Sequence, residues 1–187
     1  MQTIVDSSPL SRPSVVTVAA GQSVALLHRQ AIVWMSIAPR NVIQLPTAWP
    51  RFPAVLDTGF NASFLISQRQ LHDWAGVELD QLVLIPPGRT GWRKIYNQPI
   101  SSYQATLWMH RNAPGQRDEL TTAEPVTLYP SAGILVSPLS NQPTRLPLIG
   151  MELLESCGLQ VSLDPQTIDP VLPLFEMRFS IRSVLEV

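Results

Sequence analysis

The 187-residue chain has few of several residue types, and each shortage excludes a class of site. Cys157 is its only cysteine, so neither an intrachain disulfide nor a multi-cysteine metal site can form. Its three histidines, His28, His72 and His110, form no HxxxH or HExxH pattern. We therefore expect no metal site.

Charged residues are also scarce. They make up 14% of the chain, the net charge is −1, and Lys94 is the only lysine. The arginines are scattered and form no basic stripe, so we expect no nucleic-acid partner. No apolar run approaches the ~20 residues that cross a bilayer, and the N-terminus lacks the pattern of a signal peptide. We therefore expect a soluble, cytoplasmic protein with no membrane partner.

The residues that are present favour a mostly β fold. Eighteen prolines spread along the chain break long helices, and many short apolar runs alternate with polar residues as half-buried strands do. Two short helices are predicted, within residues 67–76 and 150–158. Ser67 followed by Gln70 predicts a capping box at the first, and Gly76 and Gly158 are natural stops.

The length suits one domain. We interpret residues 1–22 as a loosely attached N-terminal arm and residues 23–187 as a single domain. The last alternating run places Phe175, Met177, Phe179 and Ile181 on one face of a strand. That strand is expected to pair with the body of the domain or with a second subunit.

One stretch, AVLDTGFNASFLI at 54–66, ends an apolar run with the carboxylate of Asp57. Taken alone, Asp57 is either a turn residue or a reagent. An Asp-Thr-Gly after an apolar strand resembles the active-site loop of aspartic proteases. A second stretch, LPLIGMELLESCGLQVSL at 146–163, resembles the later part of a retropepsin, in which two apolar residues and a glycine pass behind the catalytic loop.

The resemblance is to the retropepsin-like aspartic protease family. Phe60-Asn61 differs from the viral pattern and is similar to a bacterial group with Asp-Thr-Gly-Phe-Asn. The resemblance to this family implies a mostly β, closed, barrel-like single lobe with two short helices. The chain has one Asp-Thr-Gly and is too short for two lobes, so an active form would be a homodimer with one Asp57 from each copy.

The resemblance also implies residue roles. Asp57 would be the catalytic carboxylate, and Thr58, Gly59, Ile149 and Gly150 would support its loop.

Substrate contacts would come from Gly59, Phe60, Asn61 and Tyr96, although Asn61 can equally be a loop-stabilising amide. Two hairpin turns compete for a flap over the substrate, PPGRTGW and KIYNQPI. We favour the second, because Asn97 suits a tight turn.

The function expected from these features is an aspartic endopeptidase that cleaves a peptide or protein substrate and needs no cofactor. Two alternatives stay open. The same fold can act as a catalytically inactive module that binds a peptide or protein in its groove. The chain can also be a structural β-protein in which the Asp-Thr-Gly is coincidental.

Overall fold

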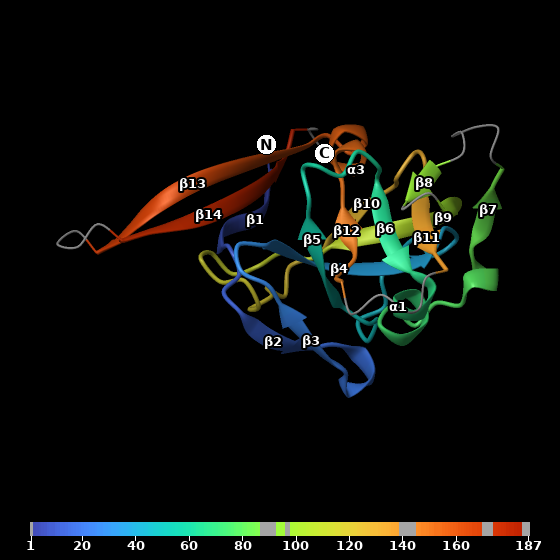
Figure 1. Cartoon of the computed structure of the whole chain (residues 1–187), viewed down its shortest axis with the longest axis horizontal. Coiled ribbons are helices and arrows are strands. Elements are labelled where there is room, and N and C mark those ends of the chain that lie inside the picture. The colour runs from blue at the N-terminus through green and yellow to red at the C-terminus, as the bar shows by residue number, and fades with distance from the viewer. Residues whose placement is uncertain (1, 87–92, 96–97, 139–144, 170–173, 185–187) are drawn as a thin grey trace.

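The computed structural model describes residues 2–86, 93–95, 98–138, 145–169 and 174–184. Within these ranges the chain is mostly β, as predicted (Figure 1). The largest sheet has nine strands. They are β4 (Ala31–Pro39), β5 (Phe52–Leu56), β6 (Phe64–Ser67), β7 (Val83–Ile85), β8 (Arg93–Ile95), β9 (Gln98–Met109), β10 (Val126–Leu128), β11 (Ile134–Ser137) and β12 (Leu148–Ile149).

This sheet closes on itself. Its strand order is β10-β9-β11-β6-β12-β5-β4, and β4 also pairs with the long strand β9. The strands β9, β11, β6, β12, β5 and β4 therefore form a closed ring. They supply large, fully buried core side chains such as Phe52, Phe64 and Leu107. Closure leaves fewer unpaired strand edges, so the ring gives the loops at its rim a rigid base.

Both predicted helices are confirmed. Helix α1 (Gln68–Asp73) begins with a capping box in which the Ser67 side chain accepts from the Gln70 backbone N–H and the Gln70 side chain accepts from the Ser67 backbone N–H. Helix α3 (Met151–Ser156) is followed by Gly158 at φ +60°, where a residue without a Cβ reverses the chain without strain. Two 3₁₀ turns are also present, η1 (Ala19–Gly21) and η2 (Leu79–Gln81).

The N-terminal segment is integrated into this fold. Strand β1 (Gln2–Pro9) pairs with β14 (Leu174–Ser183), which also pairs with β13 (Leu159–Asp169). Strand β2 (Ser14–Thr17) pairs with β3 (Ser23–Leu26), across the boundary that we placed after residue 22. Ile4 and Val5 lie in the hydrophobic core. Strands β1 and β2 of the N-terminal segment are thus both paired with strands from residues 23–187.

Candidate functional site

Asp57 lies directly after β5, in a tight turn at the rim of the ring. Its backbone N–H donates to the Ile149 carbonyl (2.9 Å), and its own carbonyl accepts from the Phe60 N–H (3.0 Å). The side-chain Oδ1 accepts from the Gly59 N–H (2.9 Å). Asp57 is half-buried, and Thr58 and Gly59 are exposed. The turn therefore fixes the carboxylate and leaves one side of it open.

Strand β12 is inserted beside this turn. It runs parallel to β5, with Ile149 opposite Leu56, and antiparallel to β6, with Ile149 opposite Phe64. The Gly150 N–H donates to the Ser63 carbonyl (2.9 Å). Residues 148–150 thus lie against both ends of the Asp57 loop, although about ninety residues separate them from it in sequence.

Gly150 is at this position because no side chain fits there. A Cβ on Gly150 would lie 2.1 Å from the Ala62 carbonyl oxygen and 2.4 Å from the Phe60 carbonyl oxygen. Its φ of −109° is available to any residue, so space and not backbone conformation requires glycine. The next N–H, of Met151, donates to the Phe60 carbonyl (2.9 Å) and closes the contact.

Gly59 borders the open side of the carboxylate. A Cβ there would lie 3.3 Å from Asp57 Oδ1, so the missing side chain keeps that oxygen approachable. Asn61 is also exposed, where its amide can reach a bound molecule. Phe60 differs from both, because it is half-buried and packs against a small cluster of Ala62, Ile100 and Leu135. Phe60 therefore anchors the loop to the body.

The hairpin that we favour as the flap is formed by β8 and the start of β9, next to the cluster of Ala62, Ile100 and Leu135. Strand β8 pairs with the start of β9, with Arg93 opposite Ile100 and Ile95 opposite Gln98. Because Ile100 packs in the cluster that Phe60 contacts, the base of this hairpin is coupled to the Asp57 loop. Tyr96 and Asn97 lie outside the described residues, as does most of the competing turn at 86–92.

Two further residues that the sequence did not single out stabilise this region. The Ser63 hydroxyl, fully buried, donates to the Gly133 carbonyl. Gly133 has φ +72°, and a Cβ there would lie 2.4 Å from the Tyr103 carbonyl oxygen. A glycine just before the apolar run at 134–137 is the sequence signal that could have identified this position.

His110 is a buried titratable group at the end of β9. The Ser36 hydroxyl donates to the Pro50 carbonyl (2.7 Å) and lies 2.9 Å from His110 Nε2, so the ring nitrogen is the donor to that hydroxyl. Burial, with a smaller contribution from the charge of Arg51, lowers the pKa of His110 to about 4. His110 is neutral near pH 7 and supports the fold rather than the Asp57 loop.

An ionic cluster near the surface joins the end of α1 to Glu78. His72 Nδ1 is 2.7 Å from Asp73 Oδ1, and His72 Nε2 is 3.1 Å from Glu78 Oε1. The hydrogen bond with Asp73 raises the pKa of His72, and the same bond is the main reason that the pKa of Asp73 falls to about 2. Because these groups are near the surface, they contribute little to stability.

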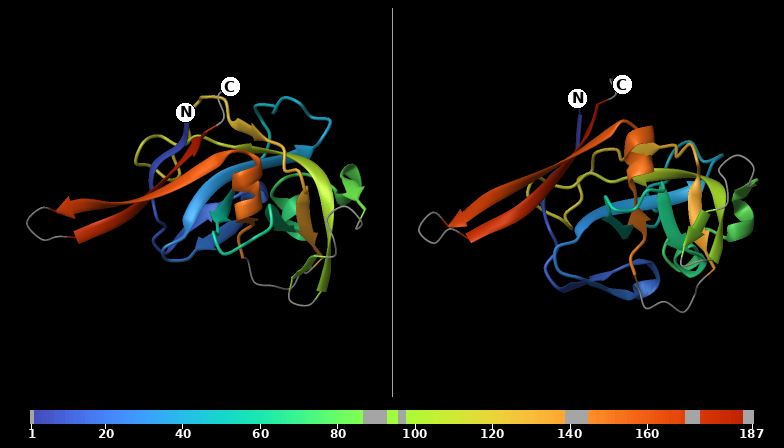
Figure 2. Two further views of the ribbon diagram at one scale, coloured as in Figure 1. Left: turned by 90° about the horizontal axis from the view of Figure 1, so that it is seen from above. Right: turned by 45° about the horizontal axis from the view of Figure 1, so that its top comes forward.

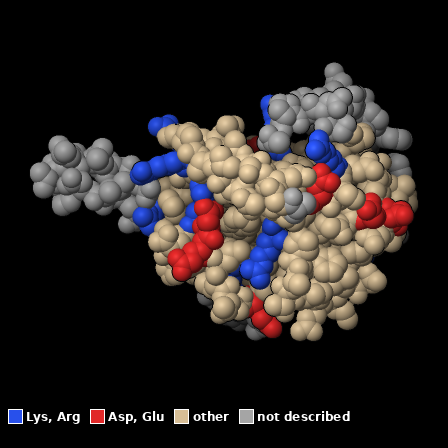
Figure 3. Space-filling view, turned by 90° about the horizontal axis from the view of Figure 1, so that it is seen from below, with Lys and Arg blue, Asp and Glu red and all other residues tan. Residues whose placement is uncertain are grey.

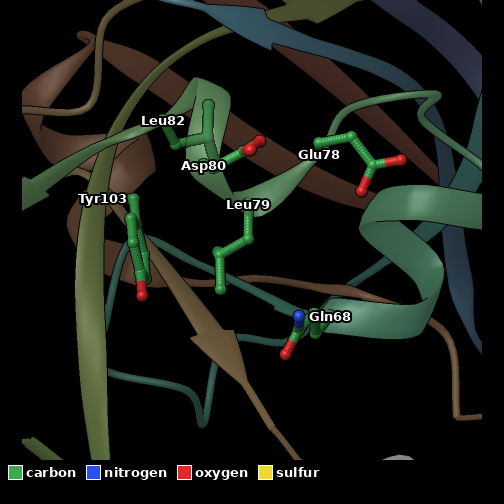
Figure 4. Close-up of a pocket in the computed structure, with 6 residues that line it drawn as sticks. All are labelled: Gln68, Glu78, Leu79, Asp80, Leu82 and Tyr103. Carbon is green, nitrogen blue, oxygen red and sulfur yellow. The ribbon is translucent and has the colours of Figure 1, made fainter.

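Open hollows lie away from the Asp57 loop. One, of about 560 Å³, is lined by Gln68, Glu78, Leu79, Asp80, Leu82 and Tyr103 (Figure 4). Another, of about 780 Å³, is lined by residues of the segments 9–14 and 116–119. Neither of these two hollows contains a residue of the 57–61 turn.

Three further observations concern surface charge, metal-binding side chains and membrane-spanning helices. On the face in Figure 3, basic and acidic side chains are interspersed and form no patch of one sign. Among the described residues, no group of three or more His, Cys, Asp or Glu side chains is placed to hold a metal ion. No helix in the described ranges is long and apolar enough to span a membrane.

Comparison with known proteins adds no relative: the chain matches no model of a protein family, no curated protein and no solved structure.

Proposed function

We propose that this chain is an aspartic endopeptidase of the retropepsin type, which acts as a homodimer with one Asp57 from each copy. Its substrate would be a peptide or a protein. The chain supplies one Asp-Thr-Gly, so a single copy carries half of the required carboxylate pair. The proposal rests on the sequence resemblance together with the surroundings of that half-site.

The observation that carries the proposal is the contact between residues 148–150 and the Asp57 turn. The Ile149 carbonyl accepts from the Asp57 N–H, and Gly150 packs against the carbonyl oxygens of Phe60 and Ala62. An aspartate in an ordinary surface turn needs no such support. Here a buried strand from the far part of the chain fixes the backbone on which the carboxylate is mounted.

The chemistry follows from placing two such carboxylates around one water. Two close carboxylates cannot both ionise easily, so they share one proton and titrate as a pair. The ionised member takes a proton from the water as it attacks the peptide carbonyl, and the protonated member donates to the carbonyl oxygen. This reaction needs no cofactor, because the pair supplies both the acid and the base.

The neighbouring residues suit supporting roles in that reaction. The exposed Thr58 hydroxyl would bond across the dimer and hold the two turns together. Gly59 leaves space beside Asp57 Oδ1 for the substrate backbone, and Asn61 can hydrogen-bond to its main chain. The β8–β9 hairpin would close as the flap and exclude water, since its base packs against Phe60.

The test compares Asp57→Asn with wild type on a peptide library at mildly acid pH. Asparagine keeps the shape but cannot hold the shared proton, so cleavage should fall by at least ~100-fold. Asp80→Asn is the matched control, because Asp80 is an exposed aspartate that lines a hollow away from Asp57. Equal cleavage by Asp57→Asn and wild type would refute the proposal. Peptide binding by wild type without any cleavage would favour the inactive binding module.

A further inference from the structure

One side chain, His72, joins the end of α1 to the turn before η2. His72 Nδ1 lies 2.7 Å from Asp73 Oδ1 on α1, and His72 Nε2 lies 3.1 Å from Glu78 Oε1. The Glu78 carboxylate is directed toward α1 (Figure 4). Helix α1 and η2 lie next to each other, at the end of the molecule opposite the β13–β14 hairpin (Figures 1 and 2). We call His72, Asp73 and Glu78 the ionic clamp.

The geometry of the clamp requires a protonated imidazole. A neutral imidazole carries one N–H, so its second ring nitrogen would turn a lone pair toward a carboxylate oxygen, whereas an imidazolium donates from both nitrogens. The hydrogen bond with Asp73 and the charge of Glu78 raise the pKa of His72 above its ordinary value of 6.5. The clamp is therefore fully formed below pH 6.5 and is lost as the pH rises through the raised pKa.

The two contacts of the ring differ in how firmly the carboxylate is held. Asp73 Oδ2 also accepts from Arg69 Nε (3.2 Å) and from Gln22 Nε2 (3.1 Å), and the Asp73 side chain is 21% exposed. The Glu78 side chain is 59% exposed. When the ring loses a proton, the remaining N–H stays with the closer and better-held Asp73, so the contact with Glu78 is the one that breaks.

Glu78 is also the residue from which η2 is ordered. The Gln81 N–H donates to the Glu78 carbonyl (3.1 Å), and the Glu78 N–H donates to the Gln81 side chain (3.0 Å). Val77 and Leu82 on either side are buried, so release of Glu78 frees only the turn between them. This turn forms one wall of the hollow in Figure 4.

We propose that His72 is a pH-dependent clamp, which fastens the η2 turn onto α1 at acid pH and releases it at alkaline pH. The wall of the hollow is thus ordered when His72 is charged and opens more often when His72 is neutral. The clamp contains no residue of the 57–61 turn, so its test does not depend on the proposed function.

The test measures hydrogen exchange of two backbone amides by NMR, those of Gln81 and Leu82, which donate to the Glu78 and Leu79 carbonyls. Rates are compared at about pH 5 and about pH 8.5, on either side of the ordinary histidine pKa, after division by the intrinsic rate at each pH. Opening should be ~2–5-fold more frequent at the higher pH. The Val42 amide, which donates to the Pro39 carbonyl (2.9 Å) in another turn, should show no such change.

Two variants and one matched control assign the effect to the clamp. His72→Gln is neutral at both pH values, so opening should be as frequent at about pH 5 as it is in wild type at about pH 8.5. His28→Gln is the control, because His28 is another exposed histidine, in the turn between β3 and β4, and the pH dependence should be kept. Glu78→Gln should lower the pKa of His72, followed by the ring proton shifts in a pH titration.

The outcomes decide between the clamp and an unrelated surface contact. Loss of the pH dependence in His72→Gln, together with its retention in His28→Gln, supports the clamp. The clamp is wrong if opening at Gln81 and Leu82 in wild type is the same at both pH values, or if His72→Gln keeps the wild-type dependence. It is also wrong if Glu78→Gln leaves the pKa of His72 unchanged.

Discussion

Replacement of Gly150 by alanine tests the contact that mounts the candidate carboxylate. The new Cβ would lie 2.1 Å from the Ala62 carbonyl oxygen and 2.4 Å from that of Phe60. Overpacking costs ~1–3 kcal/mol, and we expect the upper end because backbone oxygens cannot swing aside as a side chain can. For a chain of this size ~3 kcal/mol corresponds to a fall in melting temperature of ~6–12 °C.

The assay is equilibrium unfolding in urea, followed by circular dichroism, with the melting temperature as a second readout. Gly59→Ala is the control, because its Cβ would meet only Asp57 Oδ1, at 3.3 Å. We expect Gly59→Ala to unfold within ~1 kcal/mol of wild type while peptide cleavage falls. A Gly150→Ala variant that unfolds within ~0.5 kcal/mol of wild type would refute the reasoning, since the loop would then not depend on close packing at Gly150.

Three other predictions concern stability. The pKa of His110 is lowered to about 4 from 6.5. As the pH falls, the His110 imidazole is therefore protonated in the unfolded chain before it is protonated in the folded chain. The free energy of unfolding falls by up to ~3 kcal/mol as the pH drops from 6.5 to 4. His110→Gln should weaken the pH dependence of the free energy of unfolding, measured by urea titrations at a series of pH values. If the variant keeps the same pH dependence as wild type, other titratable groups cause it. Phe60→Ala should lower the free energy of unfolding by ~2 kcal/mol, because it removes a ring that is only half-buried, and protease digestion should become faster within the 57–63 segment. Ser67→Ala should cost ~1 kcal/mol in the same urea assay, whereas Gln68→Ala at the neighbouring exposed position should cost little.

The elements that the sequence predicted well are those determined by local chemistry. The capping box of Ser67 and Gln70 and the stop at Gly158 depend on residues a few positions apart, so both helices could be located. The turn at Asp57 also follows from an apolar run that ends in Asp-Thr-Gly. The position of Leu148–Ile149 beside it came from a family resemblance, because no local rule pairs residues that far apart.

The parts that the sequence could not predict depend on distant partners. Alternation placed Met177 and Phe179 on one face of a strand, but the exposure of the first and the burial of the second depend on where β1 ends. Closure of the ring by β4 and β9 is likewise a long-range pairing. The pairing of β1 with β14 joins the two ends of the described chain and is a long-range pairing as well.

The insertion of β12 between β5 and β6 has a consequence for biosynthesis. The hydrogen bond from Asp57 to Ile149 and the packing of Gly150 cannot form until the ribosome has released about ninety further residues. Contacts of such large sequence separation form late, because a long loop must close before they are made. A nascent chain therefore carries Asp57 without the support that holds the carboxylate in place until residues 148–150 have also been synthesised.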